Sequence, residues 1–96
     1  MVAPYTQEQR SEGLAHLPDW QFDADRNALH RDLVFQDFPQ ALAFMVRVGI
    51  EAEKADHHPE WTNVYNCVRI WLTTHDAGGV SHRDFDLART IDRILA

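Results

Sequence analysis

The hydrophobic and polar positions of this chain change period several times, and each change marks the start of a new predicted element. Three segments follow a helix-start signature, in which a capping side chain is followed three residues later by a group that can reach back to the first amides. The three pairs are Thr6 with Gln9, Asp37 with Gln40, and Ser81 with Asp84. They predict helices over about residues 7–16, 38–55 and 82–95.

Between the first two helices the pattern has a period of two, which is typical of strands. Residues 20–35 alternate in this way, and the Asp25-Arg26-Asn27 segment supplies the residues of a turn. The apolar positions expected on one face are Trp20, Phe22 and Ala24, then Leu29, Leu33 and Phe35. We therefore predict two strands joined by a short turn.

A second pair of strands is predicted between the second and third helices. Residues 61–65 and 68–74 are rich in β-branched and aromatic side chains. Asn66 and Cys67 lie between them and predict a two-residue hairpin turn. The order of elements is then αββαββα with short connections, which predicts an α+β fold: a four-stranded antiparallel sheet with three helices on one face. At 96 residues, we expect residues 1–96 to form a single domain.

The second predicted helix, residues 38–55, carries apolar residues around most of its circumference. One sheet cannot bury all of them, so we expect a second partner, in the form of a homodimer or homotetramer built through residues 38–55 and the sheet edges. We expect Phe44 at that contact. The alternative is that the short first helix covers the excess apolar surface.

Charge and composition narrow the classes of function. Asp and Glu outnumber Lys and Arg by 15 to 9, and the resulting formal charge of −6 argues against direct binding of nucleic acid. Cys67 is the only cysteine, which excludes an intramolecular disulfide and a four-cysteine metal site. The first ten residues do not resemble a secretory signal, and the apolar run of residues 41–46 is too short to span a bilayer. We expect a soluble cytoplasmic protein.

The candidate chemistry lies where the second helix ends. Residues 53–61 read Glu-Lys-Ala-Asp-His-His-Pro-Glu-Trp, so that two imidazoles, three carboxylates and an indole fall within nine positions. Imidazole has the side-chain pKa nearest physiological pH, so a histidine pair can hold one proton donor and one acceptor. His75, after the last strand, and Asp84, in the first turn of the third helix, can converge with His57 and His58 on one rim site. Glu53 lies one turn before His57.

Each of these residues has a simpler explanation when it is considered alone. The histidine pair could lie in a solvated loop, and His75 could bond a backbone carbonyl at a strand end. Asp84 could serve only as the capping-box acid of the third helix. Glu53 could be a surface partner of a neighbouring charge, and Trp61 could belong to the sheet core. We interpret His16, His30 and His82 as surface or structural residues and Cys67 as incidental.

Taken together, the spacing of these residues resembles the signature of pterin-4a-carbinolamine dehydratases. The pattern is Glu53, three residues, His57-His58-Pro59, five residues, Tyr65, nine residues, His75, eight residues, Asp84. The strings EKADHHPEW, NVYN, TH and LARTID also resemble that family, and the similarity is strongest over about residues 37–95. A match over several chemically different positions is more specific than any one of these short motifs.

The resemblance implies dehydration of 4a-hydroxytetrahydrobiopterin, which pterin-dependent aromatic amino acid hydroxylases release, to quinonoid dihydropterin and water. It implies a pterin substrate, a hydroxylase as a partner, and no metal or organic cofactor. By the same resemblance His57, His58 and His75 surround the reacting carbon, and His58 and His75 are our candidates for proton transfer. Glu53 and Asp84 would orient or charge-tune the imidazoles. Trp61 would offer an apolar surface beside the pterin.

Two other classes of function stay open on the sequence. Three histidines and a carboxylate could bind zinc in a metal-dependent hydrolase, although no helical pair of histidines has metal-ligand spacing. Alternatively the chain could be a non-catalytic binding module, because animal members of the family act as dimerisation cofactors of a homeodomain transcription factor. That role would use the apolar second helix and not the histidines.

Overall fold

The computed structural model describes residues 2–96, which form three α-helices and one four-stranded sheet. The elements are, in order, α1 (Gln7–Ala15), β1 (Gln21–Asp23), β2 (Ala28–Val34), α2 (Phe38–Ala55), β3 (Glu60–Val64), β4 (Cys67–Leu72), the short 3₁₀ turn η1 (His75–Ala77) and α3 (His82–Leu95). The predicted α+β class and the αββαββα order are confirmed. Every strand pair is antiparallel, and the strand order is β1-β2-β4-β3.

The helix starts lie where the capping signatures placed them. Thr6 and Gln9 form a reciprocal capping box at α1, and Ser81 and Asp84 form another at α3. At α2 the Asp37 carboxylate accepts a hydrogen bond from the backbone amide of Gln40, at 2.9 Å. These bonds satisfy amides that have no partner inside the helix, which is why the three starts were readable from local sequence.

The β3–β4 hairpin turns one residue earlier than predicted. Cys67 is already paired in β4, opposite Val64, so the turn consists of Tyr65 and Asn66 rather than Asn66 and Cys67. Tyr65 takes up the left-handed conformation there, with φ of 52°. Asn63 secures the turn, because its side-chain amide donates to the carbonyls of Tyr65 and Cys67.

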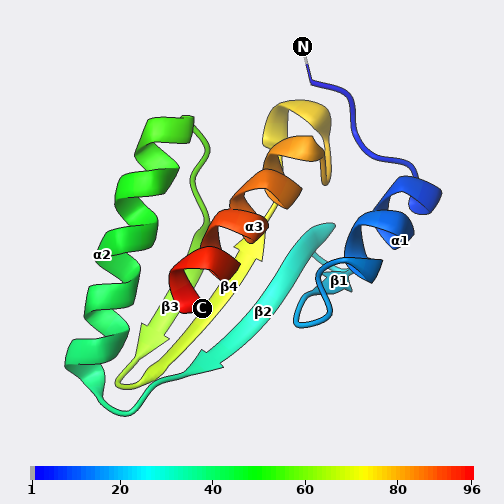
Figure 1. Ribbon diagram of the computed structural model, residues 1–96. Helices are drawn as coiled ribbons and strands as arrows, with labels where there is room; N and C mark the ends of the chain where they lie inside the picture. Colours follow the sequence, from blue (N-terminus) through cyan, green and yellow to red (C-terminus); the bar gives the residue numbers. More distant parts are fainter. Residues whose placement is uncertain (1) are drawn as a thin grey trace.

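The helices lie on one side of the sheet and leave the other side open (Figure 1). α2 and α3 cross the sheet face formed by Val68, Ile70 and Leu72, and the core fills the space between these layers. α1 lies at the edge near β1, on the same side, where Gly13 allows close packing. A Cβ atom at Gly13 would collide with the ring of Phe85 from α3.

The two faces of α2 have different surroundings. Phe44 is only 5% exposed and packs in the core, so our expectation that it lies at a subunit contact is wrong. The outward face instead carries four large apolar residues that are each more than two-fifths exposed: Phe38, Leu42, Val46 and Ile50. α1 does not cover them, because it lies at the opposite edge of the molecule (Figure 1).

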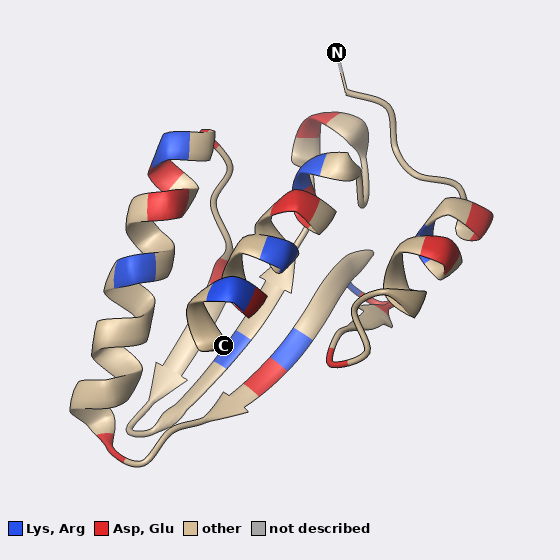
Figure 2. Ribbon diagram, in the orientation of Figure 1, with Lys and Arg blue, Asp and Glu red and all other residues tan. Residues whose placement is uncertain are grey.

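The N-terminal half of this helix also lacks charged residues on every side. Figure 2 shows the first two turns and more of α2 without blue or red, and the first charged residue of the helix is Arg47. An uncharged apolar stripe of this kind on a helix surface is typical of a contact with another protein. Even so, no helix within residues 2–96 combines the length and the apolar character needed to cross a membrane.

Candidate active site

Three histidines come together at the end of the molecule where α2 stops and α3 starts. His57, His58 and His75 all line one pocket of about 350 Å³. The chain reaches this position because α2 ends at Asp56, whose left-handed φ of 51° reverses the backbone. The amide of His57 then donates to the Ala52 carbonyl at 3.1 Å. This bend lets two adjacent histidines face the same pocket.

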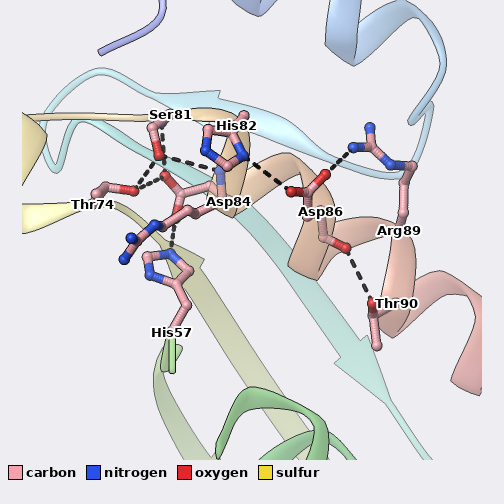
Figure 3. Close-up of polar contacts among 9 residues, drawn as sticks. His57, Thr74, Ser81, His82, Asp84, Asp86, Arg89 and Thr90 are labelled. Carbon is pink, nitrogen blue, oxygen red and sulfur yellow. Dashed lines mark hydrogen bonds and ion pairs between the residues drawn. The ribbon is translucent and has the colours of Figure 1, made fainter. Parts of the chain in front are cut away.

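His57 contacts a buried carboxylate on the interior side of its ring. Its Nε2 lies 2.6 Å from Oδ1 of Asp84, which is fully buried, while His57 itself is 11% exposed. The second oxygen of Asp84 accepts bonds from the Thr74 hydroxyl at 2.8 Å and from the Ser81 amide at 2.9 Å. Figure 3 shows these contacts converging on Asp84. A buried carboxylate requires such partners, because an unpaired one would be costly.

The capping-box acid of α3 therefore has two tasks. An ionised carboxylate only accepts hydrogen bonds, so Nε2 of His57 is the donor to Asp84, and Nδ1 is the ring nitrogen that takes no part in this bond. Our alternative, in which Asp84 serves only as a cap, does not account for this bond to His57.

His58 and His75 have similar carboxylate partners at the surface. Nε2 of His58 lies 2.7 Å from Glu53, and Nε2 of His75 lies 3.1 Å from Glu60. Both imidazoles are mostly exposed, at 57% and 81% of their side-chain surface. Three imidazoles around one pocket, each with a carboxylate on Nε2, can donate and accept protons on either side of a bound molecule.

Trp61 does not join this pocket. It is half-buried, it lies opposite Ile70 on the helix-covered side of the sheet, and it packs against the core. The pocket lining includes neither its ring nor the side chain of any other Trp, Tyr or Phe. A contact between Trp61 and a pterin stays a prediction, and its position in the structure agrees with the simpler interpretation of a core residue.

Four residues at the site were not identified from the sequence. Thr74 and Ser81 are buried and bonded to each other at 2.6 Å, next to Asp84. Glu60 pairs with His75, and Arg83 adds a cation to the pocket lining. Ser81 left a signal as a helix cap, and Glu60 was counted among the three carboxylates of residues 53–61 but not matched to a partner. Contacts between these residues and the site depend on which strand ends and loops meet, and local sequence does not encode that.

The remaining histidines lie elsewhere. His30 bonds the Ile70 carbonyl and stacks on Trp71, on the open side of the sheet. His82 pairs with Asp86 one helical turn later, at 3.1 Å, and lines a neighbouring pocket that shares His57 and Arg83 with the histidine pocket. Burial raises the pKa of Asp86, but hydrogen bonds from His82 and Arg89 outweigh it, so that the pKa lies below its ordinary value.

Within residues 2–96, no set of three or more His, Cys, Asp or Glu side chains is arranged to hold a metal ion.

This chain is similar in sequence to the proteins of one known family. The family model described as "Pterin 4 alpha carbinolamine dehydratase" matches residues 3–94. A protein of Rhizorhabdus wittichii named "Putative pterin-4-alpha-carbinolamine dehydratase" is 54% identical over 97% of this chain and 96% of its own length. A protein of Rhodopseudomonas palustris with the same name is 53% identical over 100% of this chain and 95% of its own length.

A solved structure has the same fold. It is described as a transcriptional coactivator/pterin dehydratase from Brucella melitensis, and it is 40% identical in sequence to this chain. The two structures superimpose with a TM-score of 0.93, covering 97% of this chain and 99% of the other. Both chains therefore share the complete fold and not only the region around the histidines.

Proposed function

This chain belongs to the pterin 4 alpha carbinolamine dehydratase family, and on that basis we propose that it dehydrates 4a-hydroxytetrahydrobiopterin to quinonoid dihydropterin and water by histidine acid/base catalysis. The observation that carries the proposal is the convergence of His57, His58 and His75 on one pocket, each with a carboxylate on Nε2. The reaction needs two proton transfers near neutral pH, and imidazole is the side chain suited to both.

The reaction removes water across one bond of the pterin ring. The bond between carbon 4a and its hydroxyl breaks, and an acid delivers a proton so that the hydroxyl leaves as water. The neighbouring ring nitrogen loses its proton to a base, and the electron pair of that N–H bond becomes the new double bond to carbon 4a. The proton given up by the acid is balanced by the one that the base gains.

The three imidazoles have different parts in this scheme. His58 and His75 line the pocket and are mostly exposed, so they can exchange protons with the substrate and then with water. Asp84 holds His57 in one orientation, so His57 positions the pterin ring and stabilises charge beside the reacting carbon. Glu53 and Glu60 keep the protons of their imidazoles on Nε2 and direct Nδ1 to the exchange.

The first test follows the decay of freshly generated 4a-hydroxytetrahydropterin by ultraviolet absorbance, with and without the protein. We expect acceleration that survives a metal chelator. Replacing His58 and His75 together by alanine should abolish it. His82→Ala is the matched control, because His82 is also exposed and paired with a carboxylate but lines another pocket. Acceleration that is absent, lost with chelator, or retained by the double variant would contradict the proposal.

We also propose that the protein forms a homodimer or homotetramer through α2 and the sheet edges. The support is the exposed apolar stripe of α2, together with the exposed Val64 and Tyr65 at the end of edge strand β3. Leu42→Glu should lower the mass measured by light scattering, because it places a charge in the apolar contact. Gln7→Glu adds the same charge on α1 and should leave the mass unchanged. Equal masses for both variants would remove the α2 contact.

A second candidate function is a binding module that uses the same face of α2. The description of the Brucella structure as a coactivator as well as a dehydratase favours it, and so does the uncharged stripe of α2. Binding through this stripe and catalysis by the histidines would use different residues, since the stripe lies on the side of α2 that faces away from the core. Loss of partner capture in Leu42→Glu, with capture retained in the histidine variants, would support this function.

The reaction implies further partners and a location for the protein. An aromatic amino acid hydroxylase would release the substrate, so we propose that the chain recycles the pterin of such an enzyme in the cytoplasm. Mixing a hydroxylase turning over its substrates with this protein should shorten the lifetime of the 4a-hydroxypterin intermediate. An unchanged lifetime, with an active dehydratase, would contradict this assignment.

A further inference from the structure

A second pocket lies beside the histidine pocket, on the open side of the sheet. It has a volume of about 440 Å³. Glu60, Thr73 and His75 line both pockets, so the two hollows meet across the His75–Glu60 pair. The remaining lining residues are Arg26, Asn27, Ala28, Trp71, Gly78 and Gly79. The mechanism described above uses none of these.

The walls of this second pocket are fixed relative to His75. Asn27, in the β1–β2 turn, donates its side-chain amide to the Gly78 carbonyl at 3.0 Å, and its own carbonyl accepts from the Thr73 hydroxyl at 2.9 Å. Gly79 makes this approach possible, because a Cβ there would lie 2.7 Å from the Asn27 amide nitrogen. The turn that carries Arg26 is therefore tied to the loop that carries His75.

Arg26 supplies a cation without a carboxylate partner. Its guanidinium lies 3.7 Å from the centre of the Trp71 ring, and Trp71 is itself held by a 3.0 Å bond from its indole nitrogen to Asp23. Within residues 2–96 no ion pair includes Arg26. Arg69 lies over the same ring at 5.2 Å but is paired with Asp32 at 3.1 Å. Stacking on the indole thus orients one guanidinium at the pocket and leaves its hydrogen-bond donors free of carboxylates.

The surroundings of Arg26 favour an anion as the ligand of its guanidinium. The chain carries a formal charge of −6, so an anion gains nothing from the overall field and depends on a local cation. Glu60 is the one carboxylate in the pocket lining, and it is already paired with Nε2 of His75. Guanidinium groups bind phosphate and carboxylate through paired charge-assisted hydrogen bonds, which are stronger than neutral ones.

We infer that this pocket is a subsite for the substituent on carbon 6 of the pterin, and that Arg26 favours a substituent ending in a phosphate ester. The inference rests on the proposed function, because it needs the pterin ring in the histidine pocket. Carbon 6 is bonded to the ring nitrogen that loses its proton, so it lies two bonds from the reacting carbon and its substituent starts three bonds away. A ring placed against His75 can therefore extend that substituent past His75 and Glu60 towards Arg26.

The test compares three 7,8-dihydropterins binding to the full chain by titration calorimetry. They carry on carbon 6 a methyl group, a trihydroxypropyl chain, or the same chain with a terminal phosphate ester. The wild type should bind the phosphorylated ligand about tenfold more tightly than the unphosphorylated one. In Arg26→Gln that ratio should fall to about one. Arg69→Gln, which removes the other guanidinium over Trp71, should keep the ratio.

The outcomes separate failure of the subsite from failure of the proposed function. If the methyl ligand binds the wild type and phosphate adds nothing, the subsite is wrong and the dehydratase proposal stands. If no pterin binds, both are wrong. A ratio that persists in Arg26→Gln, or that is lost equally in Arg69→Gln, also overturns the inference. Arg26→Lys keeps the charge and should retain part of the ratio, which guards against a loss caused by misfolding of the Gln variant.

Discussion

The same chemical pair, an imidazole with a carboxylate on Nε2, occurs in two different environments around one pocket. His57 and Asp84 lie inside the molecule, where the carboxylate is fully buried and accepts three hydrogen bonds in total. His58 with Glu53 and the pair His75 with Glu60 lie at the surface. The difference teaches that the inner pair is part of the fold, while the imidazoles of the outer pairs are mostly exposed to water and open to the proton transfers that we propose.

Energetics supports this division. Removing a buried acceptor typically costs about 1–3 kcal/mol for each buried donor that is left unpaired, and Asp84 accepts from three groups. A surface pair contributes only about 0–1 kcal/mol, because water and salt screen it. The inner pair should therefore respond to mutation mainly through stability, and the outer pairs mainly through turnover.

The largest expected effect is on turnover in His58→Ala. If His58 transfers a proton, its removal should lower kcat by about 10²- to 10⁴-fold. The free energy of unfolding should hardly change, since the side chain is exposed and its pair with Glu53 is a surface pair. Stopped-flow absorbance and urea unfolding measure the two effects. Near-normal turnover would remove His58 from the mechanism.

The next effect is on stability in Asp84→Ala. We expect a loss of about 3 kcal/mol in the free energy of unfolding, because the Thr74 hydroxyl, the Ser81 amide and His57 all lose their acceptor. Glu53→Ala is the control at the surface and should cost less than about 1 kcal/mol. Urea unfolding of both variants checks the contrast. Equal losses would show that burial does not separate the two environments.

A smaller effect on turnover is expected in Glu53→Gln and Glu60→Gln. Each change leaves an amide that can still contact the imidazole but no longer balances its charge, so we expect a fall of about two- to fivefold in kcat/KM. Steady-state rates across pH 6 to 8 provide the measurement. A loss as large as that of His58→Ala would place the carboxylate itself in the proton transfer.

The smallest expected effect is on the pH dependence of stability, and it concerns Asp23, which belongs to none of the three histidine–carboxylate pairs. The indole N–H of Trp71 donates to Asp23 and lowers the pKa of that carboxyl; burial opposes this shift, and backbone amides add weaker lowering effects. A lowered folded-state pKa contributes stability above the unfolded value of 3.8, and this stability is lost as pH falls through the folded-state pKa.

Asp23→Asn should therefore flatten the decline in stability below about pH 4, without altering turnover at neutral pH. Urea unfolding midpoints of the wild type and the variant at several acidic pH values test this. An unchanged acid slope would assign the decline to other carboxylates. Asp37→Asn, which alters a helix cap at another site, serves as the comparison variant.

The fold was largely predictable because its signals are local. The capping pairs at Thr6, Asp37 and Ser81 marked the starts of all three helices, since each cap satisfies amides only two or three residues away. The β3–β4 turn was misplaced by one residue. A run of β-branched and aromatic residues indicates that a strand is present, but it does not fix the register of that strand. The register depends on bonds between the strands and on those that Asn63 makes at the turn.

The site was only half predictable. The spacing from Glu53 to Asp84 indicated a set of candidate residues, and the structure brings His57, His58 and His75 of that set together. The face on which each residue of α2 would lie was less clear, because a helix that is apolar on most sides has no distinct buried stripe. Phe44 was therefore assigned to the wrong face.

By itself, the sequence determined the elements, their order, the family and the set of titratable groups, because these depend on short-range bonding and on residue identity. Only the tertiary structure decided that Asp84 lies fully buried under His57 while Glu53 and Glu60 stay in water. It likewise placed Arg26 beside His75, 49 positions away along the chain. Burial and proximity result from how helices and strands pack, and packing joins residues that no local pattern connects.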